Sequence, residues 1–167
     1  GAIYNLAGPH ASTDIPSLQG AKLALRAINY RGGVLGEPLK IVAKNGFSCE
    51  KKLDAIGEWF SYKDAIPLVF GLSHSDMLLA AAPRILERKK IFVSSGVRDE
   101  NVLKTFPRGL FFTSFSAQRQ GQSLAMFAKR RLNAQTVLII SKANLKESFQ
   151  LAEHFSKKFS HLGGTLL

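Results

Sequence analysis

Polar residues that suit the binding of a small anion follow three of the apolar runs in this sequence. The first group lies between Gly8 and Ser17, the second is Ser73-His74-Ser75-Asp76, and the third is the segment 94–99, Ser-Ser-Gly-Val-Arg-Asp. Serine hydroxyls beside backbone N–H groups suit a carboxylate or another small anion. The same serines also suit the capping of helix starts, and the residues alone leave both interpretations open.

Patterns of a nucleophile with a base, or of paired acids, are weak in this sequence. Ser73-His74 resembles part of a nucleophile pair, but adjacent loop residues rarely point at one another, and the sequence has no G-x-S-x-G motif. No pair of carboxylates stands out for acid–base catalysis. We expect Asp99-Glu100 either to be solvated or to cap a following helical turn. We therefore expect no catalytic residue and no enzymatic activity.

Signatures of phosphate-binding loops and metal sites are also missing from the sequence. It holds neither GxxxxGK[ST] nor a G-x-G-x-x-G after a strand, and the glycine-rich residues 31–36 follow a predicted helix, which indicates a turn. His154 and His161 lie on one predicted helix without a third ligand nearby. The single cysteine, Cys49, excludes an internal disulfide and a cysteine-based metal site. We expect no metal and no cofactor.

Composition excludes several further classes of protein. The 167 residues are 46% hydrophobic and 21% charged, which fits one globular domain, or one domain and a piece of another. No apolar run approaches the ~20 residues of a membrane span. No signal peptide is present, so we expect any targeting segment to have been removed or to lie outside this sequence. The net charge of +11 suits either anionic partners or a solvated basic surface. Zinc-finger spacing and a bZIP heptad are missing, and we expect no nucleic-acid binding.

Short apolar runs alternate with amphipathic stretches, and these elements must position the polar loops. Strands are predicted at 2–6, 39–43, 66–70, 91–93, 110–113, 136–140 and 165–167. Helices are predicted at 17–30, 50–60, 76–89, 117–132 and 145–162. We expect Pro83 to kink or split the third helix, and Asn144 with Glu147 to form a capping box at the last one.

This alternation predicts right-handed βαβ units and an α/β fold, with an open parallel sheet and helices on both of its faces. In such sheets ligands bind at the carboxyl ends of the strands, where the polar loops are predicted to lie. The sequence stops within its last predicted strand, so we expect it to be a fragment of a longer protein.

In their order and spacing, several segments resemble the N-terminal part of bacterial periplasmic solute-binding proteins of the leucine/isoleucine/valine-binding type. The resemblance spans almost the whole sequence. The similar segments are Gly8-Pro9, Gly20-Ala21, Ile28-Asn29, 32–36, Pro38-Leu39, 71–75, 80–83, 91–96, Phe112-Thr113 and Gln120-Gly121.

The resemblance implies the type I periplasmic fold, in which two lobes close around a ligand and present it to the permease of an ABC transporter. On this basis residues 1–116 form most of the first lobe, and residues 117–167 begin a second, similar lobe that remains incomplete. The resemblance implies an exported, periplasmic or extracytoplasmic monomer. Its ligand would be polar or amino-acid-like, either an amino acid or a small carboxylate or amide. The same fold serves as the extracellular ligand-sensing domain of signalling receptors, and the sequence leaves this alternative open.

The resemblance also assigns ligand-binding residues to the second and third polar loops. Ser75 matches a serine that holds the carboxylate of the ligand. The backbone of Ser94, Gly96 and Val97 matches a loop that meets the amino and carboxylate groups of the ligand.

Several departures from the family pattern fall in or beside the polar loops that form the predicted ligand site. His74 and Thr13 are further candidate ligand-binding residues in these loops. Thr13 lies near the place of a frequent aromatic residue. His74 replaces one half of a disulfide seen in some members, and Cys49 matches the other half, so we expect Cys49 to be a buried free thiol. Arg98 replaces a threonine that usually contacts the ligand. Facing the cleft, Arg98 would form a bidentate bridge to a carboxylate and favour a ligand with an added anionic group; the alternative is that it points to solvent.

Overall fold

The computed structural model describes residues 1–97, 99–142 and 145–167 and divides into two compact units. Unit 1 consists of residues 1–97 and 102–113, and unit 2 consists of residues 98–101 and 114–167. Two of the residues singled out in the sequence, Arg98 and Asn144, lie outside the described residues.

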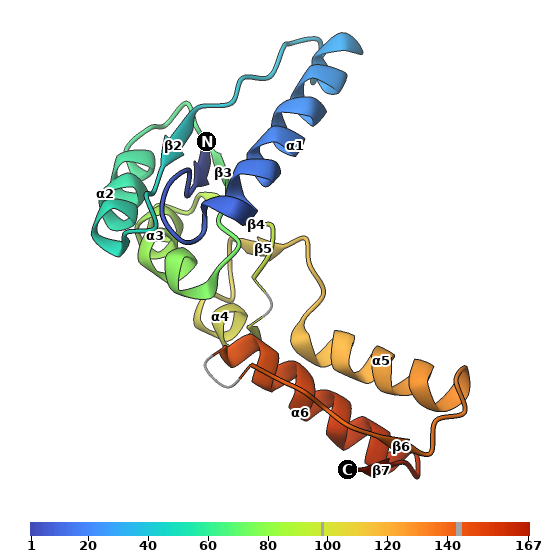
Figure 1. Cartoon of the computed structure of the whole chain (residues 1–167). Coiled ribbons are helices and arrows are strands. Elements are labelled where there is room, and N and C mark those ends of the chain that lie inside the picture. Colours follow the sequence, from blue (N-terminus) through green and yellow to red (C-terminus); the bar gives the residue numbers. More distant parts are fainter. Residues whose placement is uncertain (98, 143–144) are drawn as a thin grey trace. The chain divides into compact units, whose positions relative to one another are not determined.

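Unit 1 is built on a five-stranded sheet in which every neighbouring pair of strands is parallel (Figure 1). Its strands are β1 (Ala2–Tyr4), β2 (Ala43–Asn45), β3 (Leu68–Gly71), β4 (Ile91–Ser94) and β5 (Leu110–Phe112). They are arranged in the order β2-β1-β3-β4-β5, so the winding of the chain reverses direction between β1 and β3. This reversal is the topological switch point at which open α/β sheets bind ligands.

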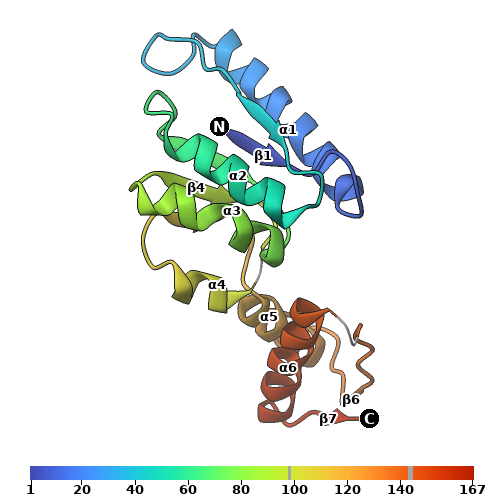
Figure 2. The same ribbon diagram turned by 90° about the vertical axis from the view of Figure 1, so that its left-hand side faces the viewer.

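Helices cover both faces of this sheet, as predicted (Figure 2). Helix α1 (Ala11–Tyr30) lies on one face, and α2 (Glu50–Ser61) and α3 (Ser75–Glu87) lie on the other. A short helix, α4 (Glu100–Thr105), precedes β5. The predicted open parallel α/β architecture is therefore confirmed.

The side chains of the central strands alternate between two apolar clusters. Ile3 and Val69 are completely buried in the larger cluster, together with Phe92 and with Leu53 and Phe60 of α2. The neighbouring strand residues Ala2 and Tyr4 are buried in a smaller cluster with Leu18 of α1. Because successive strand residues point to opposite faces, a sheet buried on both sides must be apolar at consecutive positions, as these strands are.

Helix α1 begins at Ala11, so the prediction that this helix starts at Ser17 was wrong. The backbone N–H groups of Thr13 and Asp14 donate hydrogen bonds to the carbonyl of His10 and so form the first turn of α1. Pro16 lies inside the helix. The buried Asp14 makes tertiary hydrogen bonds that hold this turn, and a local sequence pattern does not contain them. Thr13 and Asp14 are consequently helical residues rather than loop residues.

The second strand and the proline-containing helix also differ from their predictions. Strand β2 begins at Ala43, whereas residues 39–43 were predicted. The side-chain amide of Asn29 donates to the carbonyl of Leu39 and accepts from its N–H, which removes both groups of Leu39 from sheet pairing. Helix α3 is continuous through Pro83, so Pro83 does not split it.

The glycine-rich residues 31–36 form a turn, as predicted. They follow the end of α1, and Val34 and Glu37 exchange backbone hydrogen bonds in an isolated antiparallel bridge. Gly32, Gly33 and Gly36 all have positive φ, a conformation that glycine adopts without steric cost.

Unit 2 contains two helices and a two-stranded parallel sheet. Its elements are α5 (Ala117–Arg130), β6 (Thr136–Val137), α6 (Lys146–His161) and β7 (Thr165–Leu166). Ser116 caps α5 by accepting a hydrogen bond from the N–H of Arg119. The predicted strand 136–140 is shorter in the structure, since only Thr136 and Val137 pair with β7.

Across the described ranges, no helix combines the length and the hydrophobicity that crossing a bilayer requires.

Candidate functional site

A cluster of polar side chains lies at the carboxyl edge of the sheet in unit 1, at the switch point between β1 and β3. It includes Asn5 directly after β1, His10 and Asp14 at the start of α1, and Ser73 and His74 after β3. Together these side chains connect the ends of two neighbouring parallel strands to the starts of the helices that follow them.

Asp14 is the centre of this cluster and is completely buried. Its Oδ2 atom accepts hydrogen bonds from the N–H of Asn5 (2.8 Å) and from Asn5 Nδ2 (3.0 Å). Its Oδ1 atom accepts a hydrogen bond from Ser73 Oγ at 2.6 Å. A carboxylate in the first turn of a helix also interacts favourably with the helix dipole, so Asp14 is well satisfied as an acceptor. Burial first, and then the charge of Asp14, raises the pKa of Tyr4 to about 12.

Asn5 and Ser48 connect Asp14 to the loop that follows β2. Asn5 is also completely buried, and its Oδ1 accepts a hydrogen bond from the N–H of Ser48 at 2.8 Å. Ser48 Oγ donates to the carbonyl of Ala7 (2.9 Å) and accepts from the N–H of His10 (3.3 Å). Three loops at this edge are thus held by buried or half-buried hydrogen bonds, which gives the site a rigid base.

Ser73 and His74 contact each other, so the expectation that these adjacent residues point apart was wrong. Ser73 Oγ lies 3.1 Å from Nδ1 of His74. The reason is tertiary, because Asp14 draws the hydroxyl of Ser73 toward the start of α1. A serine nucleophile would donate its proton to the histidine, whereas here the hydroxyl donates to a carboxylate. The pair is therefore not arranged as an activated nucleophile.

The imidazole rings of His10 and His74 lie close together and are tilted relative to each other. Their centroids lie 3.9 Å apart with an interplanar angle of 39°, and both residues are half-buried. His10 directly precedes α1, and His74 directly precedes α3. The starts of two helices from opposite faces of the sheet therefore meet at this histidine pair.

Several of the predicted ligand-binding residues lie at the same edge of the sheet. Ser75 is the first residue of α3 and is half-buried. Ser94 ends β4, is completely buried, and donates its hydroxyl to the carbonyl of Leu72 at 2.7 Å. The side chain of Ser94 thus joins the ends of β3 and β4, which leaves the backbone as the part of this residue suited to a ligand.

Gly96 and Val97 follow β4 and have clear packing roles. A Cβ atom on Gly96 would lie 2.6 Å from Cβ of Ser73, so only glycine allows the loop after β4 to approach the loop after β3 this closely. Val97 is completely buried in the larger apolar cluster. Any contact of Val97 with a ligand would therefore come from its backbone, as the family resemblance implies.

Three further residues singled out in the sequence, Thr13, Arg98 and Cys49, do not join the polar cluster in the described structure. Thr13 has an exposed side chain on α1, and its carbonyl accepts a hydrogen bond from Ser17 Oγ. Arg98 lies outside the described residues, so its two alternative orientations stay a prediction. Cys49 is a free thiol, but it is half-buried rather than buried, and it directly precedes α2 without a side-chain capping hydrogen bond. In the described part of the chain, no three His, Cys, Asp or Glu side chains are grouped as metal ligands.

Sequence analysis missed Asn5, His10 and Asp14 as members of the site. Their signal was weak, because a polar residue after a strand and an acid near a helix start are both common.

Asp99 was expected either to be solvated or to cap a helical turn. The first alternative is wrong, because Asp99 is only 3% exposed. It accepts from the N–H of Asn101 at the start of α4, so the capping alternative is confirmed.

Asp99 also binds two residues of α6 within unit 2. Its Oδ2 lies 2.9 Å from Lys146 Nζ, and Gln150 Nε2 donates to Oδ1 at 3.2 Å. Burial alone would raise the pKa of Asp99, but these bonds and the Asn101 N–H together hold it below its usual value.

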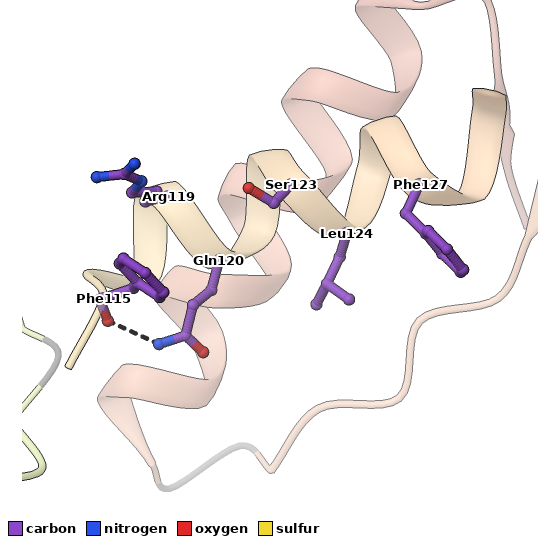
Figure 3. A pocket seen from close by; sticks show the side chains of 6 residues that line it. All are labelled: Phe115, Arg119, Gln120, Ser123, Leu124 and Phe127. Atoms are coloured by element: carbon purple, nitrogen blue, oxygen red, sulfur yellow. Dashed lines mark hydrogen bonds between the residues drawn. The ribbon is translucent and has the colours of Figure 1, made fainter. Parts of the chain in front are cut away.

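An open groove of about 610 Å³ lies along α5 in unit 2 (Figure 3). Phe115, Leu124 and Phe127 provide its apolar surface. Two of its polar side chains contact the residue before the helix start: Arg119 lies over the ring of Phe115, and Gln120 donates to the carbonyl of Phe115 at 2.6 Å. This groove lacks the buried, convergent polar groups of the cluster in unit 1, so the cluster is the better candidate site.

Comparison with solved structures supports the fold. A putative branched-chain amino acid ABC transporter protein from Rhodospirillum rubrum has a TM-score of 0.85 at 21% identity, with 99% of this chain and 47% of that chain covered. The branched-chain amino acid transporter substrate-binding protein from Streptococcus pneumoniae, in complex with isoleucine, has a TM-score of 0.82 at 20% identity, with 100% and 47% covered.

A third structure is the solute-binding protein of an ABC transporter from Rhodopseudomonas palustris in complex with 3,4-dihydroxybenzoic acid. Its TM-score is 0.80 at 17% identity, with 100% of this chain and 45% of that chain covered. The chain thus spans about half the length of these structures. The comparison with curated proteins gives no match.

The family itself is shown by the sequence. The sequence model described as "Periplasmic binding protein" matches residues 1–167, the entire chain. The resemblance identified from the order and spacing of the sequence segments is therefore confirmed. The chain belongs to the periplasmic binding protein family, and unit 1 has the parallel α/β architecture of a type I lobe.

Proposed function

We propose that this chain is part of an extracytoplasmic solute-binding protein and that a small polar or amino-acid-like ligand binds at the carboxyl edge of the unit 1 sheet. The observation that carries the proposal is the cluster around Asp14, which places buried hydrogen bonds and two helix starts at the β1/β3 switch point. Membership of the periplasmic binding protein family supports it. Two structural neighbours were solved with isoleucine and with 3,4-dihydroxybenzoic acid, and both of these ligands carry a carboxylate.

The proposed contacts follow from the family resemblance and from the place of each residue in the fold. Ser75 would bind the carboxylate of the ligand, since it opens α3 and adds a hydroxyl to the N–H groups of the first turn. Ser94, Gly96 and Val97 would contribute backbone groups, because the Ser94 hydroxyl donates to Leu72 and the Val97 side chain is in the core. Arg98 and Thr13 remain predicted contacts of the ligand.

Transport is the wider part of the proposal. Residues 1–116 would form most of a first lobe and residues 117–167 the beginning of a second lobe. Closure of two lobes around the ligand would prepare it for delivery to an ABC permease in the membrane. The protein would act as an exported, periplasmic monomer without a catalytic step. The family and the names of the structural neighbours support this role.

Thermal unfolding of the chain with a panel of amino acids, small dicarboxylates, amides and aromatic acids tests the proposal. A ligand that binds only the folded state raises stability by RT ln(1 + [L]/Kd), or roughly 2.7 kcal/mol at a 100-fold excess over Kd. A clear shift with one chemical class is the expected result. A flat response across the whole panel would contradict the proposal.

Replacing the proposed carboxylate-binding serine tests the location of the site. Ser75→Ala is expected to weaken binding of the ligand found in that panel by about 1–3 kcal/mol, because it leaves a buried polar group of the ligand without its partner. The control is Ser160→Ala, which removes an exposed hydroxyl from α6. Equal affinity of both variants in titration calorimetry would remove Ser75 from the site.

A further inference from the structure

We propose that one end of unit 2, the basic end, docks onto an anionic phospholipid membrane. The basic end consists of the cations at the ends of α5 and α6, which are Lys129, Arg130, Arg131, Lys157 and Lys158. This inference goes beyond the proposed function, because it concerns a surface that holds the protein at a membrane and that needs no solute ligand.

The fold brings the cations of the basic end together from two helices. Helix α5 leads into β6 and α6 leads into β7, and because these strands are parallel, both helices end at the same edge of the small sheet (Figure 1). Lys129 Nζ donates to the carbonyl of Gly163 at 3.1 Å, which joins the end of α5 to the turn after α6. Residues 129–131 and 157–158 therefore share one end of unit 2.

Few negative charges are available to neutralise the basic end. Residues 101–146 contain no Asp or Glu, and no acid follows Glu153 in the sequence. Glu153 pairs with Lys157 at 2.6 Å in an exposed ion pair. Across the residues that the structure describes, Arg130, Arg131 and Lys158 take part in no ion pair. The basic end thus keeps most of its positive charge in the folded chain.

The other acid of α6 lies far from the basic end. Glu147 is in the first turn of the helix, so it precedes Lys157 by about 15 Å along the helix axis. Asp99 binds Lys146 at that same start of α6. The positive charge is therefore concentrated at one end of the helix.

Helix dipoles account for only part of this pattern. Lys129, Arg130 and Lys158 lie in the last turns of their helices, where cations interact favourably with the dipole. Arg131 follows the last turn of α5, and neighbouring cations in the sequence repel one another. A partner of opposite charge would remove this repulsion.

The basic end suits an anionic bilayer better than a small anion or a nucleic acid. Arg130 and Arg131 are exposed, and the adjacent Leu132 is 64% exposed, so cations and an aliphatic side chain can enter the headgroup region together. A pocket for a small anion would instead hold buried, convergent donors. Phe159, the aromatic residue beside the cations of α6, is completely buried and offers no stacking surface to bases.

Cosedimentation of the full chain with vesicles tests the proposal. We expect the chain to bind vesicles of phosphatidylcholine with about 30% phosphatidylglycerol, to leave pure phosphatidylcholine unbound, and to dissociate as NaCl rises from about 50 to about 300 mM. Equal binding to both kinds of vesicle, or binding to neither, would overturn the proposal.

Replacing three cations of the basic end tests its location. The triple variant Arg130→Gln, Arg131→Gln, Lys158→Gln is expected to bind the anionic vesicles roughly a hundredfold more weakly, or about fivefold for each cation removed. The response of the wild type to lipid charge and to salt decides the proposal even where this variant does not fold.

A matched control removes the same amount of charge from unit 1. The triple variant Lys22→Gln, Arg26→Gln, Lys40→Gln replaces three exposed cations there and lowers the net charge equally. We expect it to retain most of the binding. Equal losses in the two triple variants would show that net charge, and not the basic end, attracts the vesicles.

Two competitors separate a membrane from other anions. Inorganic phosphate is expected to release no more protein from the vesicles than NaCl at the same ionic strength, and stronger release would indicate a phosphate site instead. Binding to single-stranded DNA without binding to the vesicles would indicate a nucleic-acid surface, and either result would overturn the proposal. None of these measurements contains a solute ligand, so a failed ligand panel would leave their outcome unchanged.

Discussion

Unit 1 and unit 2 share the pattern of parallel strands and covering helices, but only unit 1 encloses a continuous core. Its larger cluster buries aromatic and aliphatic side chains from four strands and three helices, among them Ile3, Phe60 and Phe92. Among the described residues of unit 2, Phe159 is the one large apolar side chain that is buried, and several others are exposed. Phe127 is 53% exposed, and Ile140 is 90% exposed.

The two units also differ in what their sheets can support. Five paired strands give unit 1 a rigid edge on which Asp14 and Asn5 are completely buried with their hydrogen bonds satisfied. A two-stranded sheet has an unpaired edge on each side, and such sheets contribute little stability by themselves. The comparison teaches that the apolar core of unit 1 shields a carboxylate together with its donors, whereas in unit 2 the buried Asp99 is paired with the exposed side chain of Lys146.

The largest expected effect comes from cutting a large side chain out of the complete core. Phe60→Ala in unit 1 is expected to lower the free energy of unfolding by about 3–5 kcal/mol, because Phe60 is completely buried and its removal leaves a cavity. Phe149→Ala is the matched control in unit 2, where the side chain is 60% exposed, and it should cost less than about 1 kcal/mol. Urea denaturation measures both, and equal losses would show that the two units are packed alike.

The next largest effect is expected from removing a buried carboxylate in unit 1, compared with an exposed carboxylate in unit 2. Asp14→Ala should lower the free energy of unfolding by about 3 kcal/mol, since it leaves the buried N–H groups of Asn5 and the hydroxyl of Ser73 without an acceptor. Glu153→Ala removes an exposed ion pair with Lys157 in unit 2 and should leave the free energy of unfolding without a measurable change. Denaturation of the two variants side by side provides the measurement. A small effect of Asp14→Ala would mean that water reaches these donors.

A third test compares close helix crossings in the two units. A Cβ on Gly57 of α2 would meet the carbonyl oxygen of Ala81 in α3, and one on Gly121 of α5 would lie 2.7 Å from the carbonyl oxygen of Leu151 in α6. Gly57→Ala should cost about 1–3 kcal/mol, and Gly121→Ala less, because the more open packing of unit 2 lets its helices shift.

Gly20→Ala is the control for this third test. Gly20 lies in α1 with nothing within 4 Å of its Cβ position, so alanine there should stabilise the chain by up to about 1 kcal/mol through its higher helix propensity. Thermal unfolding ranks the three variants. Stabilisation by all three would contradict the close crossings.

The smallest effect is a dependence of stability on pH in unit 2. The pKa of Asp99 is lower in the folded chain than in the unfolded one, so its contribution is present above the unfolded value and is lost as the pH falls through the folded value. Asp99→Asn should therefore be less stable than the wild type at pH 7, and the difference should shrink as the pH falls through the folded pKa. A difference that does not shrink with acidification in urea denaturation would show that the charge of Asp99 is not the cause.

Much of the fold could be predicted from local patterns. The alternation of apolar runs and amphipathic stretches predicted four of the five strands of unit 1 and its parallel α/β class, whereas β2 lies later than predicted. The positive-φ glycines of the turn at 31–36 were apparent as a glycine-rich stop after a helix. The polar loops after β3 and β4 were located correctly at one edge of the sheet. Each of these signals depends on residues a few positions apart, and the periodicity of side chains along a helix or a strand is a local property.

The members of the candidate site and their roles depended on the tertiary structure. Asp14 meets Asn5 across 9 positions and Ser73 across 59, and the approach of Gly96 to Ser73 needs the pairing of β3 with β4. The same hydrogen bonds extend α1 back to Ala11, while Asn29 withdraws Leu39 from the sheet. The sequence by itself determined the family and the order and type of most elements, because those signals are local and ordered along the chain. Only the tertiary structure decided which polar groups form hydrogen bonds with each other, because those bonds depend on distances that folding creates between remote segments.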